Sequence, residues 1–223
     1  MATLPARAVK VGKIIDKALG VVERAAVPAL IFVAVVTVLC ASISYFTVGS
    51  TSFTRIAGAE VLKSAIGVVC GYFLLVAMVR RTGLYARADD DAFLPFIGLS
   101  LLSTLGVMLG MIAFILPGLF IMARWSIAQP LLVAGGRGVM PALGESWERT
   151  KGLEFQIIGA ALVLLIPVIV ITIGVSAFFE QGDPVRIVVS QIASSGTSAV
   201  FLAMGVALYG MMVGPAQPAA TPA

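Results

Sequence analysis

One arginine stands inside an apolar stretch of this chain. Arg124 follows the segment GLFIMA and precedes a tryptophan and further apolar residues. A charged side chain at the centre of a membrane helix costs about 2.5 to 3.5 kcal/mol on insertion scales, so such an arginine needs a partner or a function. Its guanidinium can donate to a phosphate or to a buried carbonyl. We therefore expect Arg124 either to bind a ligand or to hold its span against neighbouring helices.

A second set of polar residues recurs at helical spacing in the last apolar run. Positions i, i+3, i+4 and i+7 of one helical face hold Gln191, Ser194, Ser195 and Ser198. A shorter stripe occurs earlier in the chain, at Ser100, Ser103 and Thr104. Such faces point to the interior of a bundle, where they form a polar path or hydrogen-bond neighbouring helices at about 0.6 kcal/mol per bond. The sequence favours the hydrogen bonds but leaves the path open.

Groups suited to catalysis are scarce. The chain has no histidine, so it lacks the commonest general base and metal ligand. Glu145, Glu148 and Glu154 could supply an acid and a base near the lipid headgroups, but no nucleophile with an adjacent base is visible. Cys40 and Cys70 both fall within apolar runs, as small buried residues do. We expect no enzyme activity, no cofactor and no metal site.

The composition identifies a membrane protein. Hydrophobic residues make up 60% of the 223 residues and charged residues only 12%, with a mean hydropathy of +1.07. Six apolar runs approach the length of about 20 residues that crosses a hydrocarbon core: 27–48, 61–79, 92–115, 118–134, 155–179 and 185–213. We expect an all-α bundle of six spans in a membrane domain of residues 26–213. A basic segment of residues 1–25 precedes it, and a disordered tail of residues 214–223 follows.

Basic residues predict the orientation. Most of them lie in the amino-terminal tail and in the second and fourth loops, whereas the opposite side carries Arg55, Lys63 and Arg186. The positive-inside rule then places both termini in the cytoplasm, with the protein in a plasma or inner membrane. The alternative is five crossings, because 118–134 is short and could be re-entrant.

The amino-terminal segment has the pattern of an interfacial helix. Apolar residues share one helical face, and most basic residues lie on another, at Lys10, Lys13, Lys17 and Arg24. The basic face would meet anionic phospholipid at the cytoplasmic surface. Within the spans, glycines recur four residues apart at Gly67 and Gly71, Gly106 and Gly110, and Gly210 and Gly214. This spacing predicts close helix packing and is weak evidence for a homodimer.

Residues 117–152 predict a turn, a short span and a surface helix. Pro117 and Gly118 would make the turn. Arg124 would lie about 9 Å beyond Gly118 at 1.5 Å per residue, close enough to reach toward the outer surface. After Pro130 and a glycine-rich break, Pro141 fits the first turn of a helix that ends at Gly152.

The surface helix carries three pairs at i, i+4 spacing. Glu145 and Arg149 can form an exposed ion pair, and Ser146 and Thr150 align on one face. The third pair is Leu143 with Trp147, where the tryptophan would anchor the helix at the headgroups.

These residues resemble the membrane domain of the glycerophosphoryl diester phosphodiesterase family and its stand-alone relatives. The matching elements are Pro117-Gly118, Arg124, Pro130, Ala142-Leu143, Ser146-Trp147, Thr150 and Lys151-Gly152. The resemblance agrees with six spans and implies that hydrolysis belongs to a separate soluble barrel domain, which this chain is expected to lack. It also implies an acidic residue just after the fourth span, where this chain has Gly135 and Gly136.

Together these patterns favour a non-catalytic membrane module that binds lipid or a partner protein, with no nucleic acid. Arg124 and the surface helix would carry the binding. The alternative is a small transporter that uses Arg124 and the stripe of the sixth span, although carboxylates for ion coupling are scarce there. A third hypothesis is a lipid-acting enzyme built on the three glutamates of residues 145–154.

Overall fold

A computed structural model describes residues 10–84 and 92–213, and every regular element in these ranges is an α-helix. The helices are α1 (Val11–Arg24), α2 (Ala26–Thr47), α3 (Phe53–Arg81), α4 (Phe93–Ala113), α5 (Ile115–Arg124), α6 (Ala128–Val133), α7 (Val139–Arg149), α8 (Glu154–Phe178) and α9 (Pro184–Met212). Six stretches are long and apolar enough to cross a membrane, which confirms the predicted all-α, six-span fold class. The predicted tail of residues 214–223 lies outside the described residues.

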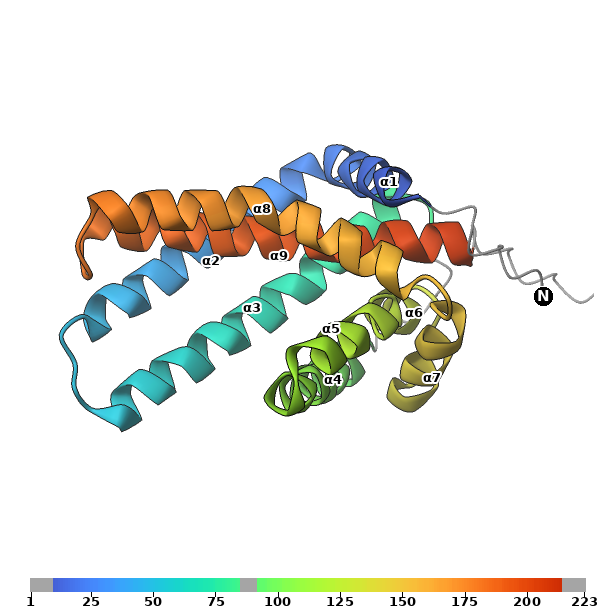
Figure 1. Cartoon of the computed structure of the whole chain (residues 1–223), viewed down its shortest axis with the longest axis horizontal. Coiled ribbons are helices and arrows are strands. Elements are labelled where there is room, and N and C mark those ends of the chain that lie inside the picture. The colour runs from blue at the N-terminus through green and yellow to red at the C-terminus, as the bar shows by residue number, and fades with distance from the viewer. Residues whose placement is uncertain (1–9, 85–91, 214–223) are drawn as a thin grey trace, which may run out of the picture.

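The long helices define two ends of the bundle (Figure 1). Helices α2, α3, α8 and α9 extend toward one end, where the α2–α3 and α8–α9 connections lie, and we name it the loop end. Helices α1 and α7 and the last turns of α9 lie at the opposite end, which we name the terminal end. The hairpin of α4 and α5 packs beside the part of the bundle nearer the terminal end.

Helix α9 forms the centre of the core at the terminal end. Its residues from Ala203 to Tyr209 are all buried, and α1, α2 and α8 pack against it. Small residues in this stretch let neighbouring helices approach closely. A methyl group added at Gly205 would come within 2.8 Å of the carbonyl oxygen of Ser126.

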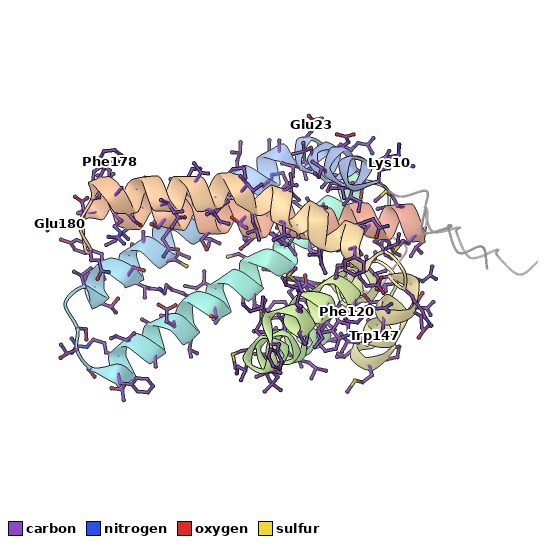
Figure 2. The ribbon with its side chains drawn as sticks, viewed as in Figure 1. Lys10, Glu23, Phe120, Trp147, Phe178 and Glu180 are labelled. Atoms are coloured by element: carbon purple, nitrogen blue, oxygen red, sulfur yellow. The ribbon has the colours of Figure 1, made fainter. Side chains whose placement is uncertain are left out.

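Large apolar side chains cover the outside of the long helices (Figure 2). On α8 the exposed residues include Leu162, Ile166, Val170 and Ile173. In water such a continuous apolar surface would be unfavourable, whereas lipid chains can cover it without a polar partner. The exposed faces therefore agree with a polytopic helical membrane protein.

The apolar face of α1 packs on protein. Ile14 and Ala18 are completely buried and Val21 is almost so, because α8 and α9 cover this face. Lys13 and Lys17 are exposed on the other side. The predicted amphipathic helix is present, but its apolar face joins the core instead of lying in lipid.

The turn between the third and fourth spans differs from the prediction. The backbone is extended at Phe114, and α5 begins at the next residue, so Pro117 lies within the first turn of a helix, where proline is tolerated. Gly118 packs against α4, where a methyl group at Gly110 would come within 3.0 Å of its Cα atom. The prediction that Pro117 and Gly118 form the turn is therefore wrong.

The fourth span is interrupted. Helix α5 ends at Arg124, and α6 begins at Ala128 after a turn that includes Trp125 and Ser126. The ring of Trp125 lies against Gly106 of α4, where an added Cβ atom would clash with it. The predicted close approach at Gly106 and Gly110 is confirmed, whereas a Cβ atom at Gly67 would meet open space.

Candidate functional site

Arg124 lies in a closed cluster at the end of α5. Its Nη2 atom is 2.7 Å from Oε1 of Glu154, and its Nη1 atom donates a 2.8 Å hydrogen bond to the carbonyl oxygen of Trp147. The side chains of this ion pair are only 8% and 11% exposed. We use the name Arg124 cluster for Phe120, Arg124, Ser146, Trp147, Thr150 and Glu154.

Two aromatic rings enclose the guanidinium. Its carbon atom lies 5.0 Å from the centroid of the Phe120 ring and 5.0 Å from that of the Trp147 ring. The rings meet edge to face, with their centroids 5.8 Å apart, and Figure 2 labels the two side chains. A cation over aromatic faces is attracted by the ring quadrupole. Trp147, predicted as a headgroup anchor, thus packs on the arginine.

The backbone of Arg124 is held as well. Its carbonyl oxygen accepts hydrogen bonds from Oγ of Ser146 at 2.7 Å and from Oγ1 of Thr150 at 3.1 Å. The last carbonyls of a helix lack an N–H partner within that helix, so α7 supplies donors where α5 ends. Both hydroxyl residues are completely buried. Their i, i+4 alignment was predicted from the sequence, but their target was not.

Glu154 is the partner that the sequence did not reveal. It is the first residue of α8, and its Oε1 also accepts a 3.1 Å hydrogen bond from the amide of Gly152. Gly152 has a positive φ of 83°, which glycine adopts without the penalty of a Cβ atom. From the sequence, Glu154 was considered only as a possible catalytic acid or base.

The guanidinium of Arg124 lies on the side of α5 that faces the terminal end. It contacts α7 and the start of α8, both at the terminal end, so it does not reach toward the loop end. Carboxylate, carbonyl and two rings surround it. These contacts favour a role in positioning α5, α7 and α8 over a role in ligand binding.

The remaining residues of the predicted signature are spread around this cluster. Pro130 lies in the first turn of α6, close to Gly205 of α9. Lys151 is exposed after α7. The predicted Glu145–Arg149 ion pair is confirmed at 2.7 Å, and Arg137 adds a 2.9 Å contact to the same carboxylate.

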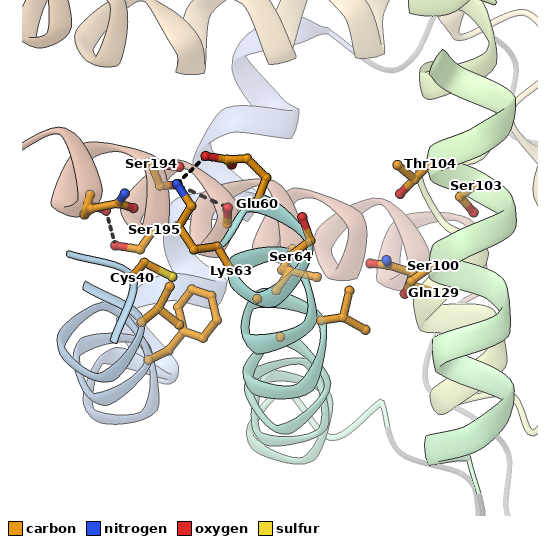
Figure 3. A pocket seen from close by; sticks show the side chains of 18 of the residues that line it. Cys40, Glu60, Lys63, Ser64, Ser100, Ser103, Thr104, Gln129, Ser194 and Ser195 are labelled. Atoms are coloured by element: carbon orange, nitrogen blue, oxygen red, sulfur yellow. Dashed lines mark hydrogen bonds and ion pairs between the residues drawn. The ribbon is translucent and has the colours of Figure 1, made fainter. Parts of the chain in front are cut away.

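A polar pocket of about 520 Å³ lies between α2, α3, α4 and α9, with Gln129 of α6 in its wall (Figure 3). All four residues of the predicted stripe of α9 line it: Gln191, Ser194, Ser195 and Ser198. The shorter stripe of α4 faces the same space, with Ser100, Ser103 and Thr104. The structure thus brings the two stripes together around one cavity, which we name the polar pocket.

An ion pair lies at the wall that α3 contributes to the pocket. Nζ of Lys63 is 2.6 Å from Oε1 of Glu60, and the two side chains are 18% and 64% exposed. Lys63 also donates to Oγ of Ser44 at 3.4 Å, which accepts from Nε2 of Gln191 at 3.3 Å. These contacts connect α2, α3 and α9.

Sequence reasoning missed Glu60 and misplaced Lys63. The predicted span began at residue 61 and Lys63 was counted with the outer loops, but α3 begins at Phe53, so both residues lie inside a candidate span. A helical signal was present, because Glu60, Lys63, Ser64 and Gly67 follow the spacing i, i+3, i+4 and i+7.

The stripe of α9 divides into bonded and open positions. Ser195 is buried and lies 3.1 Å from Oγ1 of Thr37 on α2, as the interhelical alternative predicts. Ser194 and Ser198 remain exposed in the pocket. Ser100 is only 6% exposed, and its hydroxyl has no hydrogen-bond partner among the described residues. The predicted interhelical hydrogen bond therefore occurs at Ser195, whereas Ser194 and Ser198 line the pocket, and a polar path stays a prediction.

A second pocket, of about 330 Å³, adjoins the first. The two share four lining residues, Ser103, Gln129, Ser198 and Leu202. Trp125 and Ser126 of the break in the fourth span line the second pocket. Irregular backbone within a membrane is tolerated where it is buried in protein or lines a cavity, and this break does line one.

No group of three or more His, Cys, Asp and Glu side chains in residues 10–84 and 92–213 could hold a metal ion. Comparison of the chain with models of protein families, with curated proteins and with solved structures gives no match. Function has to be inferred from the two sites themselves.

Proposed function

We propose that this membrane protein is a non-catalytic module that binds the headgroup region of a membrane lipid in the polar pocket. The observation that carries the proposal is a set of polar side chains that remain exposed within candidate spans: Glu60, Ser64, Thr104, Ser194 and Ser198. Hydrocarbon cannot hydrogen-bond such groups, so they need water, a ligand or a partner. The pocket supplies a place for a ligand.

The lining of the pocket suits an amphiphile. Besides its polar groups, the wall contains apolar side chains from α2, α3, α4 and α9: Phe32, Val36, Val68, Phe96 and Leu202. A polar headgroup can contact the hydroxyls while a hydrocarbon chain packs on this apolar part of the wall. A membrane lipid offers both parts in one molecule.

The Arg124 cluster supports this function as a scaffold. In the original hypothesis Arg124 itself bound lipid, but Glu154 and Trp147 already engage its guanidinium. We therefore assign binding to the polar pocket and positioning to the cluster. Glu145 and Glu154, two of the three carboxylates of the enzyme hypothesis, are held in ion pairs, which supports a non-catalytic role.

We further propose that both termini face the cytoplasm, in a plasma or inner membrane. Basic residues gather at the terminal end, including Lys13, Lys17, Arg137, Arg149 and Lys151. Anionic phospholipid at that surface would attract them. A relationship to the glycerophosphoryl diester phosphodiesterase membrane domain stays a prediction.

A matched pair of glycine substitutions tests the binding function. Gly67 lines the polar pocket, and a Cβ atom there meets nothing within 4 Å, so Gly67→Leu fills the pocket without a backbone clash. Gly174 on α8 has the same open surroundings and does not line the pocket, so Gly174→Leu is the control. We expect native mass spectrometry to find tightly retained phospholipid in the wild type and in Gly174→Leu, but not in Gly67→Leu. Equal retention in all three proteins would rule out the pocket as the lipid site.

The alternative is a small transporter, favoured by one observation. The two pockets adjoin, because four residues line both, and Trp125 and Ser126 of the broken fourth span line the second. An opening between the pockets would give a polar solute a path across part of the membrane. Flux of a solute into proteoliposomes that Gly67→Leu abolishes would favour this function. Absence of flux for amino acids, sugars and phosphate, with lipid still retained, would favour the binding module.

A further inference from the structure

We propose that the polar pocket selects a zwitterionic headgroup, in which Glu60 binds the cationic group and Lys63 binds the phosphate or carboxylate. This inference rests on the proposed binding function and specifies its ligand class. Of the described residues that line the pocket, Glu60 and Lys63 are the charged ones. The pocket therefore offers one negative and one positive charge and has no net formal charge.

Both charges retain capacity for a ligand. The ammonium group of Lys63 has three N–H donors, and the described contacts direct two of them to Glu60 and Ser44. Oε1 of Glu60 accepts from Lys63, and its Oε2 has no partner among the described residues. Glu60 is also 64% exposed, so its carboxylate is accessible from the pocket.

The ion pair can separate at low cost. Exposed ion pairs contribute about 0–1 kcal/mol. In this pair Glu60 is 64% exposed, so the surroundings can compensate its charge when the pair opens, while Lys63 keeps its hydrogen bond to Ser44. A zwitterion can insert between the two side chains and replace one ion pair with two. Figure 3 shows Glu60 and Lys63 close together on α3, among the side chains that line the pocket.

The charge balance of the pair determines which headgroups fit. At 1.5 Å per residue, Glu60 lies about 10 Å and Lys63 about 15 Å along α3 from its first residue, Phe53, in a helix long and apolar enough to be a candidate span. An anionic or cationic headgroup between the two side chains would leave one of them without a counter-charge. A zwitterionic headgroup supplies a counter-charge to each.

The opposite wall supplies a second and independent indication of a polar ligand. Ser100 on α4 is 94% buried, lines the pocket and has no hydrogen-bond partner among the described residues. A buried hydroxyl without a partner costs about 1–3 kcal/mol, which a bound ligand would recover. Figure 3 shows Ser100 near Gln129 and apart from the ion pair of α3, so polar groups face the pocket from two of its walls.

The experiment compares lipids that differ in headgroup charge. Purified protein is incubated with equal amounts of phosphatidylcholine and phosphatidylglycerol of the same acyl chains, and native mass spectrometry gives the ratio retained. We expect the wild type to prefer the zwitterionic lipid at least about tenfold, the ratio that 1.4 kcal/mol produces. Glu60→Gln leaves a net positive pocket and should shift the ratio toward phosphatidylglycerol.

Two further variants separate charge from structure. The double variant Glu60→Lys/Lys63→Glu keeps one charge of each sign and should keep the zwitterionic preference. Arg55→Gln removes an exposed charge of α3 that does not line the pocket, and should leave the ratio unchanged. An unchanged ratio in Glu60→Gln, or a loss of preference in the double variant equal to that in Glu60→Gln, would overturn the inference.

The source of the zwitterion is distinguished by competition. Dihexanoyl phosphatidylcholine and a free amino acid are each added in excess to the lipid-bound protein. Displacement by the short-chain lipid alone supports a lipid headgroup, whereas displacement by the amino acid supports the same charge recognition toward a soluble zwitterion. Retention of lipid without headgroup preference would refute this inference and leave the proposed function intact. Loss of pocket lipid from the wild type would refute both.

Discussion

The Arg124 cluster and the polar pocket each contain one basic–acidic pair, with nearly equal separations of 2.7 and 2.6 Å. Their surroundings are opposite. The side chains of Arg124 and Glu154 are 8% and 11% exposed, whereas those of Lys63 and Glu60 are 18% and 64% exposed. The first pair is enclosed by rings and helix ends, and the second lies at an open cavity.

The difference in exposure distinguishes a charged pair that stabilises the fold from one that is accessible to a ligand. A charge enclosed by protein groups stabilises the arrangement of those groups, and removal of its partner leaves it without compensation. A charge at a cavity is compensated by whatever occupies the cavity, so its partner can be exchanged. The buried arginine first suggested a ligand site, but the greater exposure of Lys63 and Glu60 favours that pair for the ligand site that we propose.

The largest expected effect is the loss of the buried pair. We expect Glu154→Gln to lower the free energy of unfolding by about 3–5 kcal/mol, because Arg124 would remain buried without a counter-charge. Thermal unfolding in detergent micelles would measure this change, with Glu60→Gln as the matched substitution at the exposed pair, expected to cost at most about 1 kcal/mol. Equal destabilisation by both variants would remove the distinction between the two regions.

A second prediction concerns the boundary between the regions, where α9 passes the break in the fourth span. We expect Gly205→Ala to destabilise the protein by about 1–3 kcal/mol, because its methyl group would press on the carbonyl oxygen of Ser126. Gly196→Ala on the same helix meets open space and should be neutral or stabilising, by up to about 1 kcal/mol. The two melting temperatures give the comparison. An unchanged melting temperature in Gly205→Ala would show that the turn between α5 and α6 can move away from α9.

The smallest effect is expected from serine substitutions. Ser146→Ala removes a donor to the carbonyl of Arg124 and should cost about 1 kcal/mol, moderated because Thr150 donates to the same oxygen. Ser194→Ala in the pocket should change stability by less than about 0.5 kcal/mol, because its side chain is exposed. Chemical denaturation in mixed micelles would measure the free energies of unfolding of Ser146→Ala and Ser194→Ala. A larger loss from Ser194→Ala would show that the pocket contributes to the fold.

Features that depend on local composition could be predicted from the sequence. The six apolar runs appear as six candidate spans, because length and hydropathy suffice to identify a membrane helix. The helix around Pro141 forms α7, since proline fits a first turn and Gly152 follows its end. The Glu145–Arg149 pair followed from i, i+4 spacing alone.

Features that depend on contacts between distant segments could not be predicted. Glu154 pairs with Arg124 because α5 and α8 pack together, and residue spacing in the sequence does not predict which helices pack together. The sequence placed the start of the second span at residue 61, too late, because Glu60 and Lys63 lower the local hydropathy. In the structure these two residues form an ion pair and line the polar pocket. Phe114, not Pro117 with Gly118, makes the turn before α5, because proline is compatible with the first turn of a helix.

The pairing of Arg124 with Glu154 also constrains how the protein is made. During synthesis the fourth span emerges before α7 and α8, so Arg124 reaches the membrane before the carboxylate and the hydroxyl groups that later bind it. At that stage the arginine lowers the tendency of its own span to enter the bilayer. We therefore expect the fourth span to reach its final place only when the chain has been extended to Glu154, so that insertion of this segment depends on the helix that follows it.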